Sequence, residues 1–120
     1  MKYQEFYLRT TSTLSKGKIL QNPGGGRTTI TRYTDTHMVY RRRNSEIRVS
    51  MRDLYTAYRT FSGKEVSSTD LREYMPKVYS KSGHPCNCTL LFMVLKAIGV
   101  VTMIEGEGKR GSPFRVTIIS

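Results

Sequence analysis

The last residues before Ser50 alternate between polar and apolar positions, a pattern that predicts a β-strand. In Glu46–Val49, the apolar residues Ile47 and Val49 fall on one face and the charged residues on the other, as a half-buried strand requires. β-branched and aromatic residues dominate the chain before Ser50, which also favours strands. We therefore expect an antiparallel meander with short turns, built from strands over Lys2–Thr10, Arg27–Tyr33, His37–Arg42 and Glu46–Val49.

From Ser50 onward the period changes to that of a helix. The apolar residues fall at i, i+3, i+4, i+7 and i+10, namely Met51, Leu54, Tyr55, Tyr58 and Phe61. Ser50 suits the N-cap, and Asp53 three residues later completes a capping-box pattern. Gly63 stands where a glycine commonly ends a helix. These signals predict a helix over residues 50–62.

The remaining elements are shorter. Val66 is expected in a strand of one bridge, and Ser67 or Ser68 caps a short helix that Pro76 limits. After it we expect, in order, a polar turn at Lys77–Gly83, a third helix from about Pro85 that is densely apolar over Thr89–Ile98, a strand at Val100–Ile104, a flexible loop at Glu105–Pro113 and a return strand at Phe114–Ile119.

This order of elements resembles the winged-helix class of helix-turn-helix domains over residues 50–120. The resemblance implies that the third helix enters the major groove and that the hairpin, the wing, touches the DNA backbone. It would start the recognition element near His84 and Asn87, put Lys109 and Arg110 at the wing tip, and add Arg115 on the return strand. We expect an α+β fold in which a β-sheet subdomain (residues 1–49) packs on this second subdomain (residues 50–120) in one compact domain.

The third helix departs from that class because it is apolar nearly all round. A helix in a groove needs a polar face toward the base edges. Either its N-terminal end alone reaches DNA, with contacts from Lys77, Ser80, Lys81, Ser82, His84 and Asn87, or its outer face packs on the N-terminal sheet or on a second subunit as a homodimer. In the second case the Arg-rich sheet is the nucleic-acid surface, and the sequence leaves both readings open.

The charge balance indicates a polyanionic partner. The chain of 120 residues has 20 Lys and Arg against nine Asp and Glu, a net charge of +11. Residues 1–60 contain 12 of these cations and four of the acids. We expect non-catalytic binding of double-stranded DNA, with RNA as a further possibility. The alternative is a small interaction protein or inhibitor that binds an acidic protein surface, such as that of a nucleic-acid enzyme.

Two clusters are the candidate contacts. Arg41, Arg42 and Arg43 lie between a strand end and a turn, where they can splay around phosphates, and Tyr33 and Tyr40 could stack on bases. The second cluster surrounds the turn before the third helix and consists of Lys77, Lys81, His84 and Asn87. The competing interpretations are a solvated hairpin with core-edge tyrosines, and a polar loop in which Asn87 caps the helix.

Neither a metal site nor a catalytic site is expected. His84, Cys86 and Cys88 are three candidate zinc ligands where a structural site needs four, and the two cysteines suit buried small hydrophobes better. The acids are scattered, so no cofactor and no catalytic residue is predicted. The chain has no apolar run of membrane-spanning length and no signal-peptide core at its start, so we expect a cytoplasmic or nucleoid-associated protein.

Overall fold

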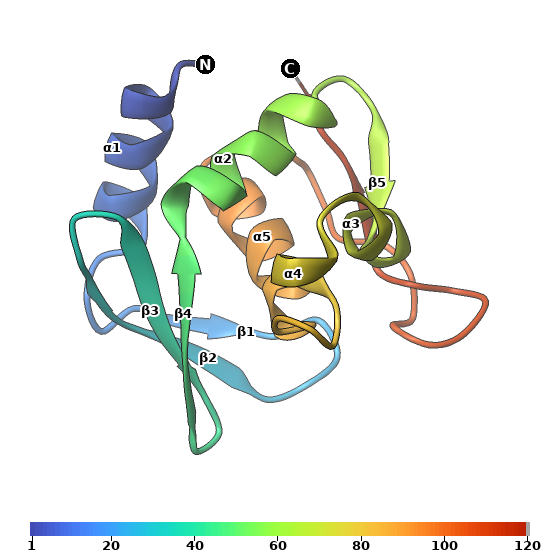
Figure 1. The fold of residues 1–120 in the computed structure, drawn as a ribbon, viewed down its shortest axis with the longest axis horizontal. Helices are drawn as coiled ribbons and strands as arrows, with labels where there is room; N and C mark the ends of the chain where they lie inside the picture. The colour runs from blue at the N-terminus through green and yellow to red at the C-terminus, as the bar shows by residue number, and fades with distance from the viewer. Residues whose placement is uncertain (120) are drawn as a thin grey trace.

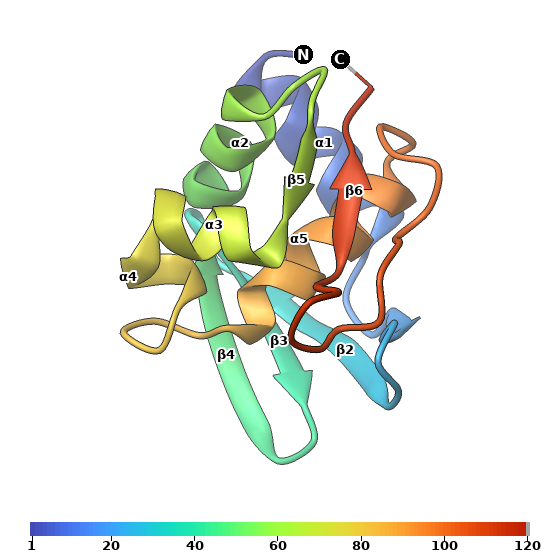
Figure 2. The ribbon, with the colours of Figure 1, turned by 90° about the vertical axis from the view of Figure 1, so that its right-hand side faces the viewer.

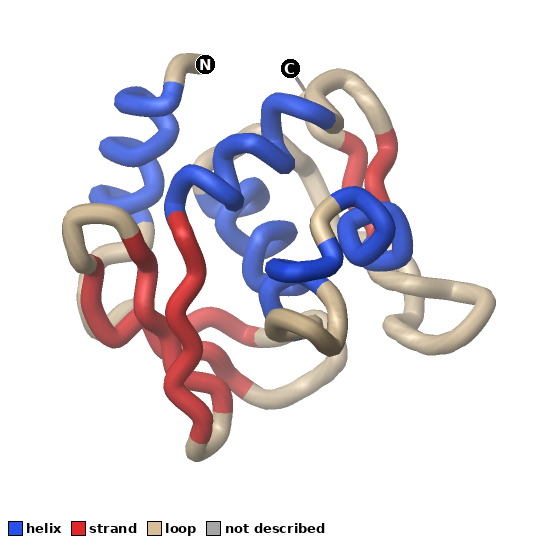
Figure 3. The backbone as a smooth tube through the Cα atoms, viewed as in Figure 1, coloured by secondary structure: helices blue, strands red, loops and turns tan. Residues whose placement is uncertain are grey.

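The computed structural model describes residues 1–119, and Ser120, the last residue of the predicted second subdomain, lies outside the described residues. The fold is α+β (Figures 1 and 3). Its helices are α1 (Tyr3–Thr13), α2 (Met51–Thr60), α3 (Ser68–Tyr74), α4 (Pro76–Tyr79) and α5 (Cys86–Ala97). Its strands are β1 (Ile19–Gln21), β2 (Arg27–Tyr33), β3 (His37–Arg42), β4 (Ser45–Ser50), β5 (Glu65–Ser67) and β6 (Arg115–Thr117). Within residues 1–119, no helix combines the length and apolarity that a membrane span requires.

The larger sheet is an antiparallel meander in the order β1-β2-β3-β4. The three predicted strands between residues 27 and 49 are confirmed, with β2 and β3 at the predicted bounds. Opposite Tyr40, the register places Ile30 on one side and Ile47 on the other. These three side chains are buried and define the inner face of the sheet. The short edge strand β1 was not predicted.

The N-terminal segment Lys2–Thr10, predicted as a strand, is instead part of the helix α1. Tyr3, Phe6, Tyr7 and Thr10 fall at i, i+3, i+4 and i+7, which is one face of a helix. That face packs on α2, where Phe6 stacks with Tyr58 at 5.8 Å between ring centroids. Helical packing against α2 therefore overrides the strand preference of the aromatic residues.

Both predicted helix starts are confirmed at their caps. The Ser50 hydroxyl accepts a hydrogen bond from the Asp53 backbone N–H at 3.3 Å and begins α2. Ser67 and Asp70 form a reciprocal capping box at the start of α3. Between α3 and α5 the predicted polar turn is partly helical, because Pro76 begins the single turn α4.

Helix α5 forms the centre of the core. Every side chain from Leu90 to Leu95 is buried. Tyr40 on the inner face of the sheet donates a hydrogen bond to Asn87 of α5, and helices α1, α3 and α4 also contact α5. The apolar residues of this helix from Leu90 to Leu95 therefore pack within the chain, on the sheet and the other helices.

The smaller sheet pairs β5 with β6 in antiparallel register, with Val66 opposite Val116. The predicted strand Val100–Ile104 is wrong, since this segment carries no regular ladder. It contacts the C-terminal segment only at its ends, where Ile119 donates to the Val100 carbonyl and Glu105 pairs with Arg115. Val100 and Glu105 are five residues apart, whereas their partners Ile119 and Arg115 are four residues apart. The two segments are therefore out of register between these contacts and cannot form an unbroken ladder.

Candidate nucleic-acid interface

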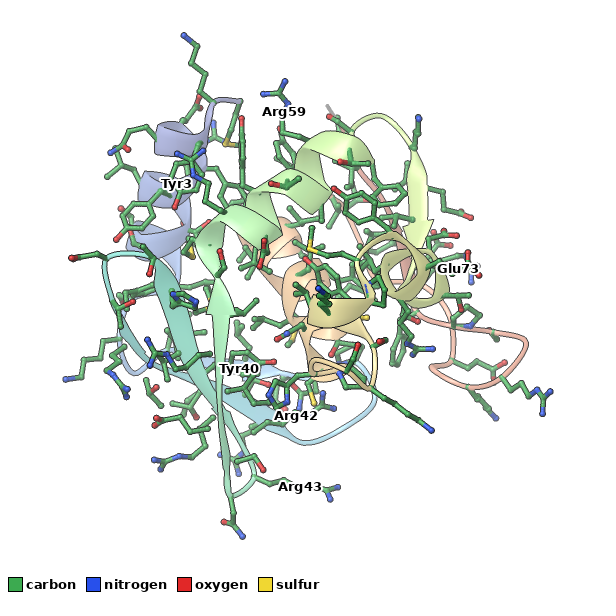
Figure 4. All side chains as sticks on the ribbon, viewed as in Figure 1. Tyr3, Tyr40, Arg42, Arg43, Arg59 and Glu73 are labelled. Atoms are coloured by element: carbon green, nitrogen blue, oxygen red, sulfur yellow. The ribbon has the colours of Figure 1, made fainter. Side chains whose placement is uncertain are left out.

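The β3–β4 hairpin extends beyond the rest of the molecule (Figures 1 and 2). Arg41 lies opposite Glu46 and Arg42 opposite Ser45, so the two arginines point to opposite faces of the hairpin. Arg42 points inward and donates to the Thr89 hydroxyl of α5 at 3.4 Å. Arg43 occupies the tip, where its side chain extends away from the molecule (Figure 4). The three arginines therefore surround the end of the hairpin.

A surface hollow of about 600 Å³ separates the hairpin from the turn before α5. His84 of the turn and Cys86 at the start of α5 line it on one side, and the hairpin lines it on the other with Arg42, Arg43, Ser45, Glu46 and Ile47. A separate, smaller hollow brings Lys77 together with His84 and Asn87. Lys81 is exposed and lines neither hollow.

On the other side of Arg42, a groove of about 600 Å³ runs to the loop Glu105–Pro113. We call it the basic groove. Its lining residues are Arg42, Ser68, Thr69, Arg72, Pro85, Cys86, Cys88, Thr89, Gly108, Lys109, Arg110, Gly111, Pro113 and Phe114. This lining contains four cations and no acidic residue. The basic groove thus joins the predicted hairpin contact to the predicted wing tip.

The shape of the loop depends on glycine. Gly108 has φ +75°, and a Cβ there would lie 2.4 Å from the Phe114 ring. Gly106 has φ +96°, and a Cβ there would lie 2.1 Å from the Pro113 carbonyl oxygen. These positions exclude larger residues and hold the two cations of the loop, Lys109 and Arg110, at the rim of the basic groove.

Most cations of the chain are not neutralised locally. Among residues 1–119, the ones within ion-pairing distance of a carboxylate are Arg9, Arg32, Lys109 and Arg115. Arg42, Arg72 and Arg110 of the basic groove are not among them. An unpaired guanidinium group at a concave surface attracts anions and binds a phosphate through its planar fork.

Arg115 is not a groove residue, contrary to the resemblance-based prediction. Its guanidinium group lies 3.8 Å from Glu65 and 3.9 Å from Glu105, and the side chain is half-buried. The pairing of β6 with β5 brings these charges together. Arg115 therefore ties the loop to the smaller sheet instead of facing a nucleic acid.

Both predicted stacking residues pack against the core. Tyr40 is 1% exposed and donates to Asn87 Oδ1 at 2.7 Å. Tyr33 is half-buried and donates to the Leu14 carbonyl at 2.6 Å. Burial raises the pKa of both hydroxyls, so both remain protonated donors. The inner-face register directs both rings toward the core, so Tyr40, which is fully buried, is not available to stack on a base.

Asn87 is likewise not a base-contacting residue. Its side chain is 3% exposed and bridges two elements. Its Oδ1 accepts from Tyr40, and its Nδ2 donates to the Val78 carbonyl at 2.9 Å. The amide therefore joins β3, α4 and α5, and the N-cap position of α5 belongs to Pro85.

The two cysteines differ in environment. Cys86 is partly exposed between the hollow and the basic groove. Cys88 is 1% exposed and its Sγ lies 3.5 Å from the Tyr79 carbonyl. Burial raises the pKa of the Cys88 thiol to about 11, and the nearby Arg72 guanidinium offsets part of this rise. Among residues 1–119, no three His, Cys, Asp or Glu side chains gather as metal ligands.

We expect this difference to govern thiol reactivity. At pH 8, a disulfide-exchange reagent should modify the partly exposed Cys86 rapidly in the folded protein. Cys88 should react only when the protein unfolds, because its side chain is 1% exposed to the reagent, and burial also raises the pKa of its thiol. The absorbance of the group that the reagent releases, followed over time, measures the reaction rate of each thiol. A Cys86→Ser variant should lose the fast phase alone. Equal rates for both thiols in the folded protein would contradict the burial of Cys88.

Some residues of this surface were missed in the sequence. Arg72 and Thr89 reach the basic groove from α3 and α5, and no local pattern marks them. Arg27 borders Ile19, Thr29, Arg41 and Arg43 on the outer face of the larger sheet. Arg48 also lies on that face, since Val39 of β3 pairs with Arg48 on one side and with Arg32 on the other. Strand alternation could have identified both arginines.

Comparison with known proteins adds no relative. No protein-family model, curated protein or solved structure matches this chain.

Proposed function

We propose that this protein binds double-stranded DNA without catalysing a reaction. The observation that supports this most is the basic groove, whose lining combines Arg42, Arg72, Lys109 and Arg110 with no acidic residue. Three hydroxyl groups lie among these cations, from Ser68, Thr69 and Thr89. Arginine forks and hydroxyl donors are the groups that contact phosphate oxygens in protein–DNA interfaces.

In this proposal, residues 50–119 act as a winged-helix-like half with a modified binding mode. The order α2, β5, α3, α4, α5 and β6 supports it, together with the pairing of β5 with β6 next to the loop that carries Lys109 and Arg110. The loop Glu105–Pro113 takes the place of the wing. Helix α5 contributes its N-terminal end, through Thr89 and the adjoining turn, because its side chains from Leu90 to Leu95 are buried.

The charge of the surface predicts strongly salt-dependent binding to duplex DNA. If about five phosphates are neutralised, the logarithm of affinity should fall against the logarithm of salt concentration with a slope of about −4 to −5. Fluorescence anisotropy with a labelled mixed-sequence duplex at several salt concentrations measures this slope. The absence of binding even at low salt would overturn the proposal and leave an acidic protein surface as the partner to test.

Replacing Lys109 and Arg110 by alanine should weaken binding to all duplex sequences to a similar extent. The salt slope should fall by about two, since each cation accounts for about one phosphate contact. The pair between Lys109 and Glu107, at 3.5 Å, does not prevent this because both side chains are largely exposed. The control is the double variant Lys2→Ala and Lys64→Ala, in which both charges are removed from the end of the molecule remote from the hairpin. An equal loss in both variants would indicate a general charge effect.

A further inference from the structure

We propose that the β3–β4 hairpin is the element that enters the major groove, with Arg43 contacting a base edge and Arg41 and Arg42 contacting the two flanking phosphate backbones. This inference rests on the proposed function, since it assigns how duplex DNA is bound. The two-stranded hairpin then contacts the bases in the major groove, whereas the winged-helix resemblance would assign this role to α5.

The first argument is the position of the hairpin. Arg41, Arg43, Asn44 and Ser45 are exposed, and the hairpin extends away from the helices (Figures 1 and 2). A major groove about 12 Å wide admits a two-stranded ribbon, whose strands lie about 5 Å apart. Helix α5 cannot take this role because its side chains from Leu90 to Leu95 are buried.

The second argument is the alternation of the arginines. Arg41 borders the outer-face hollow with Arg27, whereas Arg42 borders the basic groove with Arg72. A ribbon inserted between two phosphate backbones needs cations on both faces, and this arrangement supplies them. The one acid on the projecting strands, Glu46, lies 3.3 Å from Arg32, so Arg32 compensates its charge and leaves Arg41 free.

The third argument is the backbone of Arg43. The two-residue turn between the paired residues Arg42 and Ser45 has Arg43 at φ +57°, in the left-handed region. Glycine or asparagine is preferred at such a position, and an arginine there costs conformational free energy. Strain of this kind is typical of contact sites. The side chain that it holds at the tip is a guanidinium fork, which matches the two acceptors of a guanine in the major groove.

The test uses the full chain and duplexes selected from a random-sequence pool. We expect methylation of guanine N7 at one position of the selected duplex to weaken binding of the unaltered protein roughly tenfold, because it blocks the major-groove acceptor. Arg43→Gly should bind the unmodified duplex more weakly by a similar factor and should no longer respond to methylation. Arg43→Lys should keep the salt slope and part of the methylation effect, because lysine keeps the charge and a donor to guanine but loses the planar fork.

Thermal unfolding separates a contact from a folding defect. Arg43→Gly and Arg43→Asn should unfold at the same temperature as the unaltered protein or higher, since both residues tolerate the left-handed backbone. Lys64→Ala is the control for charge. Strong binding that is insensitive to N7 methylation, or that a minor-groove ligand displaces, would overturn the hairpin assignment and leave duplex binding intact. No binding to any duplex at low salt would instead overturn the proposed function, and this inference with it.

Discussion

Replacing Arg41, Arg42 and Arg43 together by alanine is expected to lower the affinity for mixed-sequence duplex DNA by a few hundredfold at ~0.1 M salt. The two lost phosphate contacts of Arg41 and Arg42 reduce the salt slope by about 1.8, which is a factor of about 60 at ~0.1 M relative to 1 M salt. The lost base contact of Arg43 adds about another factor of ten. The three side chains lie around one exposed hairpin, and none of them has a carboxylate within ion-pairing distance among residues 1–119. Anisotropy titrations at several salt concentrations measure both quantities.

The matched control removes three charges at the opposite end of the molecule, with Lys2→Ala, Arg59→Gln and Lys64→Ala. Glutamine keeps a donor for the Tyr55 hydroxyl, to which Arg59 donates at 2.9 Å. This variant should lose little affinity, because Arg59 lies far from the hairpin (Figure 4), as do the N-terminus with Lys2 and the connection between α2 and β5 with Lys64 (Figure 1). Full affinity of the hairpin variant beside a Lys109 and Arg110 variant that does not bind would restrict the interface to the loop.

The second large effect is expected on stability. Asn87→Ala should lower the free energy of unfolding by about 2–4 kcal/mol, because the Tyr40 hydroxyl and the Val78 carbonyl would each lose a buried hydrogen-bond partner. Denaturant unfolding measures this change. Tyr40→Phe should cost less, about 1–2 kcal/mol, since the Val78 bond remains.

The exposed neighbour His84 supplies the control for this prediction. His84→Ala should leave the unfolding free energy within about 0.5 kcal/mol, as is usual at a surface position. It should weaken DNA binding, because His84 lines the hollow with Arg42 and Arg43. An Asn87→Ala variant of normal stability with an altered base preference would reverse the assignment and return Asn87 to the interface.

Several features follow from local sequence alone. The β-branched and aromatic composition of residues 27–49 and the alternation in Glu46–Val49 predict β2, β3 and β4, and the helical period from Met51 predicts α2, because composition and period are local properties of the sequence. Ser50, Ser67 and Gly63 predict helix ends because capping depends on neighbouring backbone atoms. The charge of +11 and its excess in the first half are likewise sequence properties.

Other features were decided only by long-range packing. The segment Lys2–Thr10 carries both a strand composition and a helical spacing, and contact of its aromatic face with α2 selects the helix. Asn87 and Tyr40 look like polar surface candidates in the sequence, yet they meet in the core over a separation of 47 residues. The burial of a polar side chain depends on whether a distant partner satisfies its hydrogen bonds, and no local pattern contains that information.

The candidate interface also combines features that local sequence determines with features that only the tertiary structure determines. The sequence by itself identified the exposed basic turns at Arg41–Arg43 and Lys109–Arg110, because turn residues and charge are local. Only the tertiary structure decided that Arg72 of α3 and Thr89 of α5 lie between them, and that Arg115 is occupied by Glu65 and Glu105. A groove is formed by segments far apart in the chain, so its lining depends on how the sheet and the helices pack around α5.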